Sequence, residues 1–220
     1  SVMDNRTLYI GIDLASDHRR FHFSAVEDDL SLNAISSGHS EDVLAFLAGQ
    51  SSAVVVFNAP TPPCPDTIQL NLIEIDEAAS RSGSTAWMQQ GYSFYKHMDE
   101  LGFHNDESSR RYRSVDGETA WKDLCLGNLF PAQTLESRLQ RQLILVDLGL
   151  PLTDPMQFFE EITRHKLLHG NLPVDTIHSA AELSALLCAY LAWASDHRPD
   201  GIEISVSAGA LVRAARQTQE

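Results

Sequence analysis

The chain has 220 residues, of which 43% are hydrophobic and 21% charged, and its formal net charge at pH 7 is −14. This length and apolar share suit one globular domain. The acidity disfavours broad, nonspecific binding to phosphate backbones, because like charges repel at long range. The three scattered cysteines form no CxxC pair, so they predict neither a zinc knuckle nor a disulfide framework.

No segment approaches the ~18 consecutive apolar residues of a membrane span. The N-terminal letters SVMDNRT lack the apolar core of a signal peptide. We therefore expect a protein of the reduced cytoplasm that does not associate with membranes.

The first elements of the chain predict an antiparallel meander. Residues 7–14, TLYIGIDL, are apolar and β-branched, which is typical of a strand. The alternating letters FHFSAVED at 21–28 predict a second strand, and LNAISS at 32–37 a third. Two short polar connections join them, so consecutive strands should run in opposite directions.

A helix and a buried strand should follow. Ser40 can cap a helix whose first turn holds Glu41 and Asp42, near the positive end of the helix dipole, and Gly49 fits its C-terminus. Residues 53–57, AVVVF, form an apolar run without polar alternation. Such a run indicates a strand buried on both faces, as in the parallel part of a sheet.

Residues 59–120 are expected to contain an insertion into the domain. The letters TPPCP exclude regular structure, because proline lacks the amide donor and fixes φ. Beyond them the pattern predicts a helix over 85–101 and an exposed loop over 102–118. A further strand is expected at 124–130, LCLGNLF, where Pro131 would end it.

Helices dominate the last part of the predicted structure. One helix is expected at 134–147, and Asp154-Pro155 should begin another that ends before Gly170. The clearest helix lies at 179–195, since its apolar residues follow the i, i+3, i+4, i+7 spacing. These residues are Leu183, Leu186, Leu187, Tyr190, Leu191 and Ala194.

This order predicts a single α/β domain over residues 1–220, with an antiparallel three-strand meander followed by parallel strands and flanking helices. Ligands of such sheets sit beyond the carboxyl ends of neighbouring strands. Asp13 ends the first strand and Asn58 the first buried one, so the two side chains would share a crevice if these strands are parallel neighbours. Asp13 could then hold Mg²⁺, or it could be a turn-forming aspartate that bonds its own backbone.

Four short motifs together carry a resemblance to a known family. They are YIGIDLAS, VVVFNAP, NLFPA and ELSALLCAYLAW, in this order over about residues 7–195. Together they resemble an uncharacterised family of predicted nucleases with a ribonuclease H-like fold. The family pattern has a strand ending in Asp, a strand ending in Asp-x-Pro, a Glu-x-Tyr-Pro segment and a last helix bearing Asp-Ala. The resemblance implies a ribonuclease H-like fold and a two-metal phosphodiesterase whose carboxylates bridge Mg²⁺ or Mn²⁺.

The chain departs from that pattern at three of its four acidic positions. Asp13 matches, while Asn58, Asn128 and Ser184 stand where the family has acids, and these four are the candidate catalytic residues. Amide and hydroxyl oxygens can coordinate a cation but add no negative charge. We therefore expect weak binding of Mg²⁺ or Mn²⁺, and slow or absent hydrolysis.

Other acids could complete the metal site. Glu182 is the second candidate metal ligand beside Asp13, but it lies ~200° around the helix from Ser184. Only one margin of the helix can face Asp13, and the resemblance assigns that margin to Ser184, which leaves Glu182 a poor replacement. Glu118 is a further acid that could contribute.

Histidines and arginines offer weaker signals. His165 and His169 have the i, i+4 spacing that zinc sites use, but no third ligand is evident, and a packed or surface pair is favoured. A nucleic-acid partner would need a local basic patch, although solvated arginine is the more frequent role. The candidates are Arg19, Arg20, Arg110, Arg111, Arg113, Arg138 and Arg141.

Three functions remain open. The first is a metal-dependent nuclease, and the second is a non-catalytic binding protein on the same fold. The third is a phosphotransferase of the actin-like and sugar-kinase type, whose first strand also resembles YIGIDLAS. Leu14-Ala15-Ser16 lacks the glycine of its phosphate loop, and 220 residues are short for two lobes, so this third function is disfavoured. The substrate and the oligomeric state do not follow from the sequence.

Overall fold

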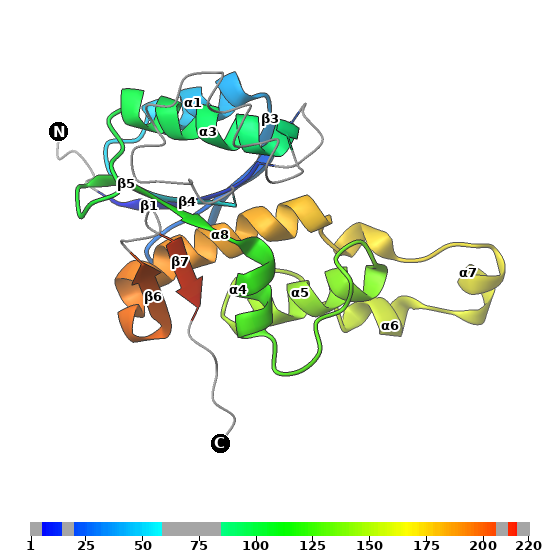
Figure 1. The fold of residues 1–220 in the computed structure, drawn as a ribbon. Coiled ribbons are helices and arrows are strands. Elements are labelled where there is room, and N and C mark those ends of the chain that lie inside the picture. Colours follow the sequence, from blue (N-terminus) through cyan, green and yellow to red (C-terminus); the bar gives the residue numbers. More distant parts are fainter. Residues whose placement is uncertain (1–5, 15–19, 59–84, 206–210, 215–220) are drawn as a thin grey trace.

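The protein has an α/β architecture in which a mixed sheet lies between two layers of helices (Figure 1). A computed structural model describes residues 6–14, 20–58, 85–205 and 211–214. The described strands follow the spatial order β3-β2-β1-β4-β5-β7-β6. Their bounds are β1 Leu8–Asp13, β2 Phe21–Val26, β3 Leu32–Gly38, β4 Ala53–Asn58, β5 Arg110–Val115, β6 Ile202–Ser205 and β7 Leu211–Ala214.

The strand directions confirm the predicted meander followed by parallel strands. β1 pairs antiparallel with β2, and β2 with β3. On its other side β1 pairs parallel with β4, and β4 pairs parallel with β5. β7 continues parallel to β5, while β6 returns antiparallel to β7. The carboxyl ends of β1, β4 and β5 therefore meet at one edge of the sheet.

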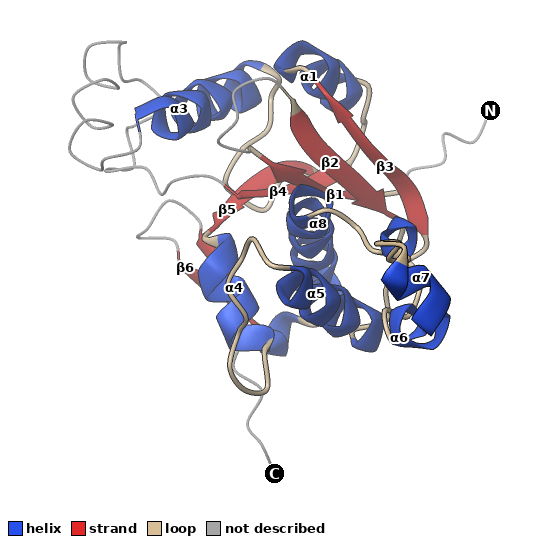
Figure 2. Ribbon diagram, turned by 90° about the vertical axis from the view of Figure 1, so that its right-hand side faces the viewer, coloured by secondary structure: helices blue, strands red, loops and turns tan. Residues whose placement is uncertain are grey.

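Alternation along the strands divides the apolar residues between two cores. One face of the sheet packs under α1 (Ser40–Ala48) and α3 (Thr85–Glu100), where Phe57 lies among aromatic rings. The opposite face packs against α8 (Ala180–His197), with α4 (Gly117–Leu124) and α5 (Leu135–Asp147) beyond it (Figure 2). The predicted apolar stripe of α8 is confirmed, since all six of its residues are buried.

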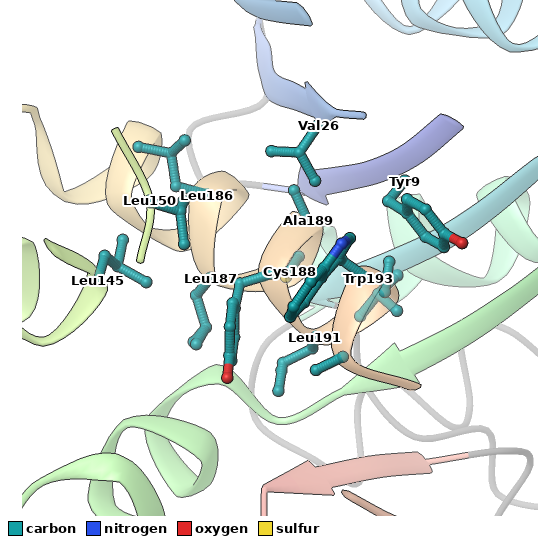
Figure 3. Packing of buried hydrophobic residues seen from close by; sticks show 14 of the residues in the cluster. Tyr9, Val26, Leu145, Leu150, Leu186, Leu187, Cys188, Ala189, Leu191 and Trp193 are labelled. Carbon is teal, nitrogen blue, oxygen red and sulfur yellow. The ribbon is translucent and has the colours of Figure 1, made fainter. Parts of the chain in front are cut away.

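Helix α8 is buried on nearly all sides because it lies between the sheet and the outer helices (Figure 3). Its length and apolar composition would also suit a membrane span. However, 67% of the most apolar window within 174–197 is buried inside the fold. The core helix of a globular domain has the same composition, so this helix is explained by its packing.

The closest contact in this layer is between α8 and Gly11 of β1. A Cβ atom added to Gly11 would lie 1.9 Å from the Ala185 carbonyl oxygen and 2.1 Å from the Ala189 amide nitrogen. Both are backbone atoms, so no side-chain rotation could relieve the clash. Glycine is therefore needed here to let the helix backbone rest directly on the strand.

Gly11→Ala should destabilise the protein by about 3 kcal/mol or more, since α8 must move away from the sheet to admit the methyl group. Urea unfolding followed by circular dichroism would measure the change. Gly127→Ala is the matched control, because an added Cβ there meets no atom within 4 Å. An unchanged midpoint for Gly11→Ala would show that the helix does not rest on this residue.

The loop expected at 102–118 is confirmed over 102–109 and wrong beyond, because β5 occupies Arg110–Val115 and pairs with β4 along its whole length, and α4 begins at Gly117. The letters RRYRSV do not predict a buried strand, because three of the six residues are arginines. Arg113 is nevertheless only 4% exposed, and its guanidinium donates to the carbonyl oxygens of Tyr112 and Asp106 and contacts Glu107. The arginine can be buried because these partners satisfy its donors.

The strand expected at 124–130 is also wrong. Asp116 accepts a hydrogen bond from the Thr119 amide and so caps α4, which ends at Leu124 and is followed by an irregular loop. At α1 the cap is His39 rather than Ser40, since Asp42 accepts from the His39 amide. The helices expected at 85–101, 134–147 and 179–195 are confirmed within two residues.

The single helix predicted between Asp154 and Gly170 is broken in two. Ile162 is extended, and Thr163 caps a second helix by accepting from the Lys166 amide. The resulting helices, α6 (Gln157–Glu161) and α7 (Arg164–Leu168), and the short 3₁₀ turn Val174–Thr176 form a projection at residues 154–176, here named the arm. Figure 1 shows α7 at its far end, away from the sheet.

The arm is tied to α5 at its base. The buried amide of Gln142 donates to the carbonyl oxygens of Thr153 (2.8 Å) and Thr176 (3.0 Å), and accepts from the His178 amide (2.8 Å). Arg138 donates to the carbonyl oxygens of Ile177 and His178. One helix thus holds both ends of the arm, and the direction of the projection is fixed by hydrogen bonds.

Gln142→Leu should cost about 2 kcal/mol, because three partly buried backbone groups lose their hydrogen-bond partner. It should also expose the base of the arm to proteases. Limited proteolysis with mass mapping would detect faster cleavage near 153 and 176. Asp147→Asn, an exposed change on the same helix, should leave the cleavage pattern unchanged, and equal cleavage in both variants would contradict the anchoring role.

Candidate functional site

Three of the four predicted site residues meet at the carboxyl edge of the sheet. Asp13 of β1 and Asn58 of β4 are partners in register on parallel neighbouring strands. Helix α8 adds Ser184, whose Oγ donates to Asp13 Oδ1 at 2.9 Å. Asn58 Nδ2 lies 3.2 Å from the same oxygen and 3.4 Å from Ser184 Oγ. Asp13 is only 7% exposed, so it is a buried acid held by two other elements rather than a simple turn residue.

The amide of Asn58 is fixed from its other side by α4. The backbone amide of Gly117 donates to Asn58 Oδ1 at 3.2 Å. A Cβ at Gly117 would lie 3.1–3.3 Å from the atoms of that side-chain amide, so glycine allows the helix to approach closely. Asn58 therefore donates to Asp13 with its nitrogen and accepts from α4 with its oxygen. Both ends of its amide have partners, which makes asparagine a structural fit for this position.

Sequence reasoning gave no role to His22, which lies beside this cluster. His22 of β2 is the antiparallel partner of Asp13, and opposite residues of an antiparallel pair share one face of the sheet. Its Nδ1 atom is buried and has no hydrogen-bond partner in the described ranges of the chain. The proximity follows from the strand register, which pairs His22 with Asp13 and cannot be read from the sequence pattern.

Asn128 is not brought to the cluster by any contact in the described structure. It lies on the exposed loop after α4, where its carbonyl oxygen accepts from Gln140 Nε2 at 2.8 Å. Its place in a Glu-x-Tyr-Pro-like segment is therefore not matched by a contact with Asp13, and its proposed catalytic role stays a prediction.

The two alternative acids are engaged elsewhere. Glu182 forms the capping box of α8, where its carboxylate accepts from the Ser179 amide at 2.8 Å and contacts His178 Nδ1 at 3.4 Å. Burial alone would raise the pKa of Glu182, but the Ser179 amide and His178 outweigh it and lower the pKa below its ordinary value. Glu118 forms a two-pronged ion pair with Arg141 at 2.9 and 3.1 Å.

The donor set does not fit a pair of divalent cations. Across the residues whose placement is described, no three His, Cys, Asp or Glu side chains lie close enough together to hold a metal ion. The described neighbours of Asp13 are an amide, a hydroxyl and an imidazole, so the described part of the cluster supplies one formal negative charge. Asp17, in the turn after Asp13, lies outside the described residues.

Cysteine chemistry is also disfavoured at this site. Cys188 is fully buried on α8, and its burial followed by the charge of Asp13 raises the pKa of the thiol well above its ordinary value. A thiolate is the form of cysteine that acts as a nucleophile. Cys188 therefore serves as a small apolar core residue beside Gly11.

The arginines singled out as candidate phosphate contacts are used within the fold. Arg110 lies over the Phe103 ring, and Arg111 pairs with Asp196. The partners of Arg113, Arg138 and Arg141 are described above. Arg20, which directly precedes β2 at the same sheet edge as Asp13, is exposed, and Arg19 lies outside the described residues.

The histidine pair of the arm is a surface pair. His165 and His169 lie on α7 and at its end, with ring centroids 4.2 Å apart, and both are exposed. The extended residue Ile162 ends α6 before these histidines, so they lie on a different helix from the buried Phe158.

Comparison with known proteins found no matching family model, no matching curated protein and no matching solved structure.

Asn58→Asp should destabilise the protein by about 3 kcal/mol at neutral pH, because a donor to Asp13 becomes a second buried carboxylate. Mn²⁺ should raise the melting temperature of this variant more than that of the parent, since the cation relieves the repulsion. Differential scanning fluorimetry with and without Mn²⁺ measures both effects. Asn128→Asp, the matched change on an exposed loop, should alter neither; equal behaviour of the two variants would contradict the cluster.

Proposed function

We propose that this chain has a ribonuclease H-like fold and belongs to the predicted-nuclease family whose motifs it resembles, with metal-dependent phosphodiester hydrolysis that is weak or lost. The meander followed by parallel strands, with helices on both faces, supports the fold. The juxtaposition of Asp13, Asn58 and Ser184 supports the family, because three positions matched by motif lie together in space.

The single observation that carries the loss of hydrolysis is the hydrogen bonding of Asp13 Oδ1. This oxygen accepts from Ser184 Oγ and from Asn58 Nδ2, so neutral donors occupy the space where the family has acids. Two divalent cations bring four positive charges, and the cluster offers one negative charge against them. Catalysis by two metals requires both ions to be held in a fixed geometry. Mg²⁺ or Mn²⁺ would bind weakly here, with Asp13 as the charged ligand.

Purified protein should show little Mg²⁺- or Mn²⁺-dependent cleavage of single- or double-stranded RNA or DNA, and Asp13→Ala should leave this background unchanged. Calorimetric titration should find no tight Mn²⁺ site in the parent. The double change Asn58→Asp with Ser184→Asp should increase Mn²⁺ affinity by about tenfold or more, because it adds two charged ligands.

Two outcomes would overturn this proposal. Robust cleavage by the parent that Asp13→Ala abolishes would show a working metal centre. Tight binding of two Mn²⁺ ions to the parent would show that other acids complete the cluster. Asn128→Asp with Ser184→Asp is the matched control for the double variant, since it adds the same charge but places one carboxylate on an exposed loop.

A non-catalytic binding protein is the second candidate, and the closed hydrogen-bonded cluster favours it. Asn58 and Ser184 satisfy Asp13 without a cation, so the fold does not need a metal to hold this acid. A nucleic acid would have to approach an acidic molecule through the exposed Arg20 near the carboxyl edge. Retention of labelled RNA without cleavage, weakened by Arg20→Glu, would favour this candidate over hydrolysis.

A further inference from the structure

The arm carries most of the exposed large apolar side chains of the described structure. Six of the eight such residues lie on it, and Leu168 (72%) and Phe159 (55%) are among the most exposed. The six are Met156, Phe159, Leu167, Leu168, Leu172 and Val174. Isolated helices of five residues, the length of α6 and α7, are not stable in water. An apolar concentration of this kind indicates a surface that another molecule covers.

The arm also carries charges that have no ion-pair partner in the part of the chain that the structure describes. None of the ion pairs among the described residues involves Glu160, Glu161, Arg164 or Lys166. Glu161 ends α6 and Arg164 begins α7, so each charge lies at the helix end whose dipole opposes it. Local helix stability therefore does not explain Glu161 and Arg164, whereas opposite charges on a partner would; Glu160 in the first turn of α6 and Lys166 in the last turn of α7 are placed favourably for their own helices.

The distribution of charge identifies the partner. The whole chain has a net charge of −14, so two copies repel each other over most of their surface. Between residues 160 and 166 the two glutamates balance Arg164 and Lys166, which leaves this segment neutral. A two-fold axis through the segment would bring the acidic end of one arm against the basic end of the other.

We propose that the arm is a homodimerisation element, in which the apolar side chains of two arms pack together about a two-fold axis. The glutamates of α6 in one copy then face Arg164 and Lys166 of the other. Gln142 and Arg138 hold the arm in its projecting position before association, which lowers the entropic cost of binding. The inference is independent of the proposed function, since the arm and the Asp13 cluster share no residue.

Light scattering coupled to size-exclusion chromatography, with sedimentation velocity over a range of concentrations, tests the apolar part. The parent should be a dimer, and Leu168→Glu should weaken association by about 100-fold or more, because it buries a charge in the interface. Leu126→Glu is the matched control, since Leu126 is 66% exposed on the loop between α4 and α5. It should remain dimeric, and circular dichroism should show all three proteins folded.

Two charge-reversed variants test the two-fold geometry. Glu160→Lys with Glu161→Lys makes the charged residues of segment 160–166 all basic, and Arg164→Glu with Lys166→Glu makes them all acidic. Each alone should dimerise about tenfold or more weakly than the parent, and an equimolar mixture should form the heterodimer. A tag on one variant allows the heterodimer to be isolated and counted.

The opposite results overturn the proposal. A parent that stays monomeric at every concentration shows that the arm does not bind its own copy. A dimer that Leu126→Glu disrupts and Leu168→Glu leaves intact places the interface elsewhere. Failure of the two charge-reversed variants to pair when mixed excludes the two-fold arrangement even if the parent is dimeric.

Discussion

The contact between α8 and Gly11 is the constraint on which the rest of the structure depends. The helix backbone rests on the strand backbone with no room for a single Cβ atom, which fixes the helix height above the sheet and its register along β1. Because Ser184 immediately precedes the contacting Ala185, this register also carries the serine to the end of β1. The hydrogen bond to Asp13 is a direct consequence, so a packing interaction in the core determines the composition of the site.

Among the described residues, the site is a polar cluster in which neutral donors hydrogen-bond to Asp13 Oδ1. Asp13 receives donors from β4 and α8, and Asn58 is in turn held by the amide at the start of α4. An acid set built for two metals has the opposite character, because its carboxylates repel one another until the ions bind. A site that has neutral donors in place of such acids does not need a metal to relieve repulsion, so the folded protein is stable without the cation. Under the family membership that we propose, the neutral donors Asn58 and Ser184 account for both the hydrogen-bonded cluster and the weak hydrolysis.

The arm and the carboxyl edge of the sheet are separate parts of the molecule, and their side chains differ in how far they are paired within the described structure. At the carboxyl edge, Asp13, Asn58 and Ser184 hydrogen-bond to one another. On the arm, Glu160, Glu161, Arg164 and Lys166 have no ion-pair partner among the described residues and apolar side chains are exposed, while Gln142 holds the base in place. This contrast explains why we assign association to the arm and ligand chemistry to the sheet edge.

The sequence alone determined the elements whose apolar patterns are strong, together with the pairing of Asp13 and Asn58, because both residues end apolar strands. It did not reveal β5, because the arginines of this segment suggest an exposed loop. Only the tertiary structure shows the carbonyl and carboxylate partners with which Arg113 is buried. Nor did the sequence show that His22 faces Asp13, that Asn128 lies on an exposed loop, or that Glu182 caps its own helix. Local patterns record which side chains prefer burial, whereas strand register and helix placement decide which of them meet, and those depend on contacts between residues far apart in the chain.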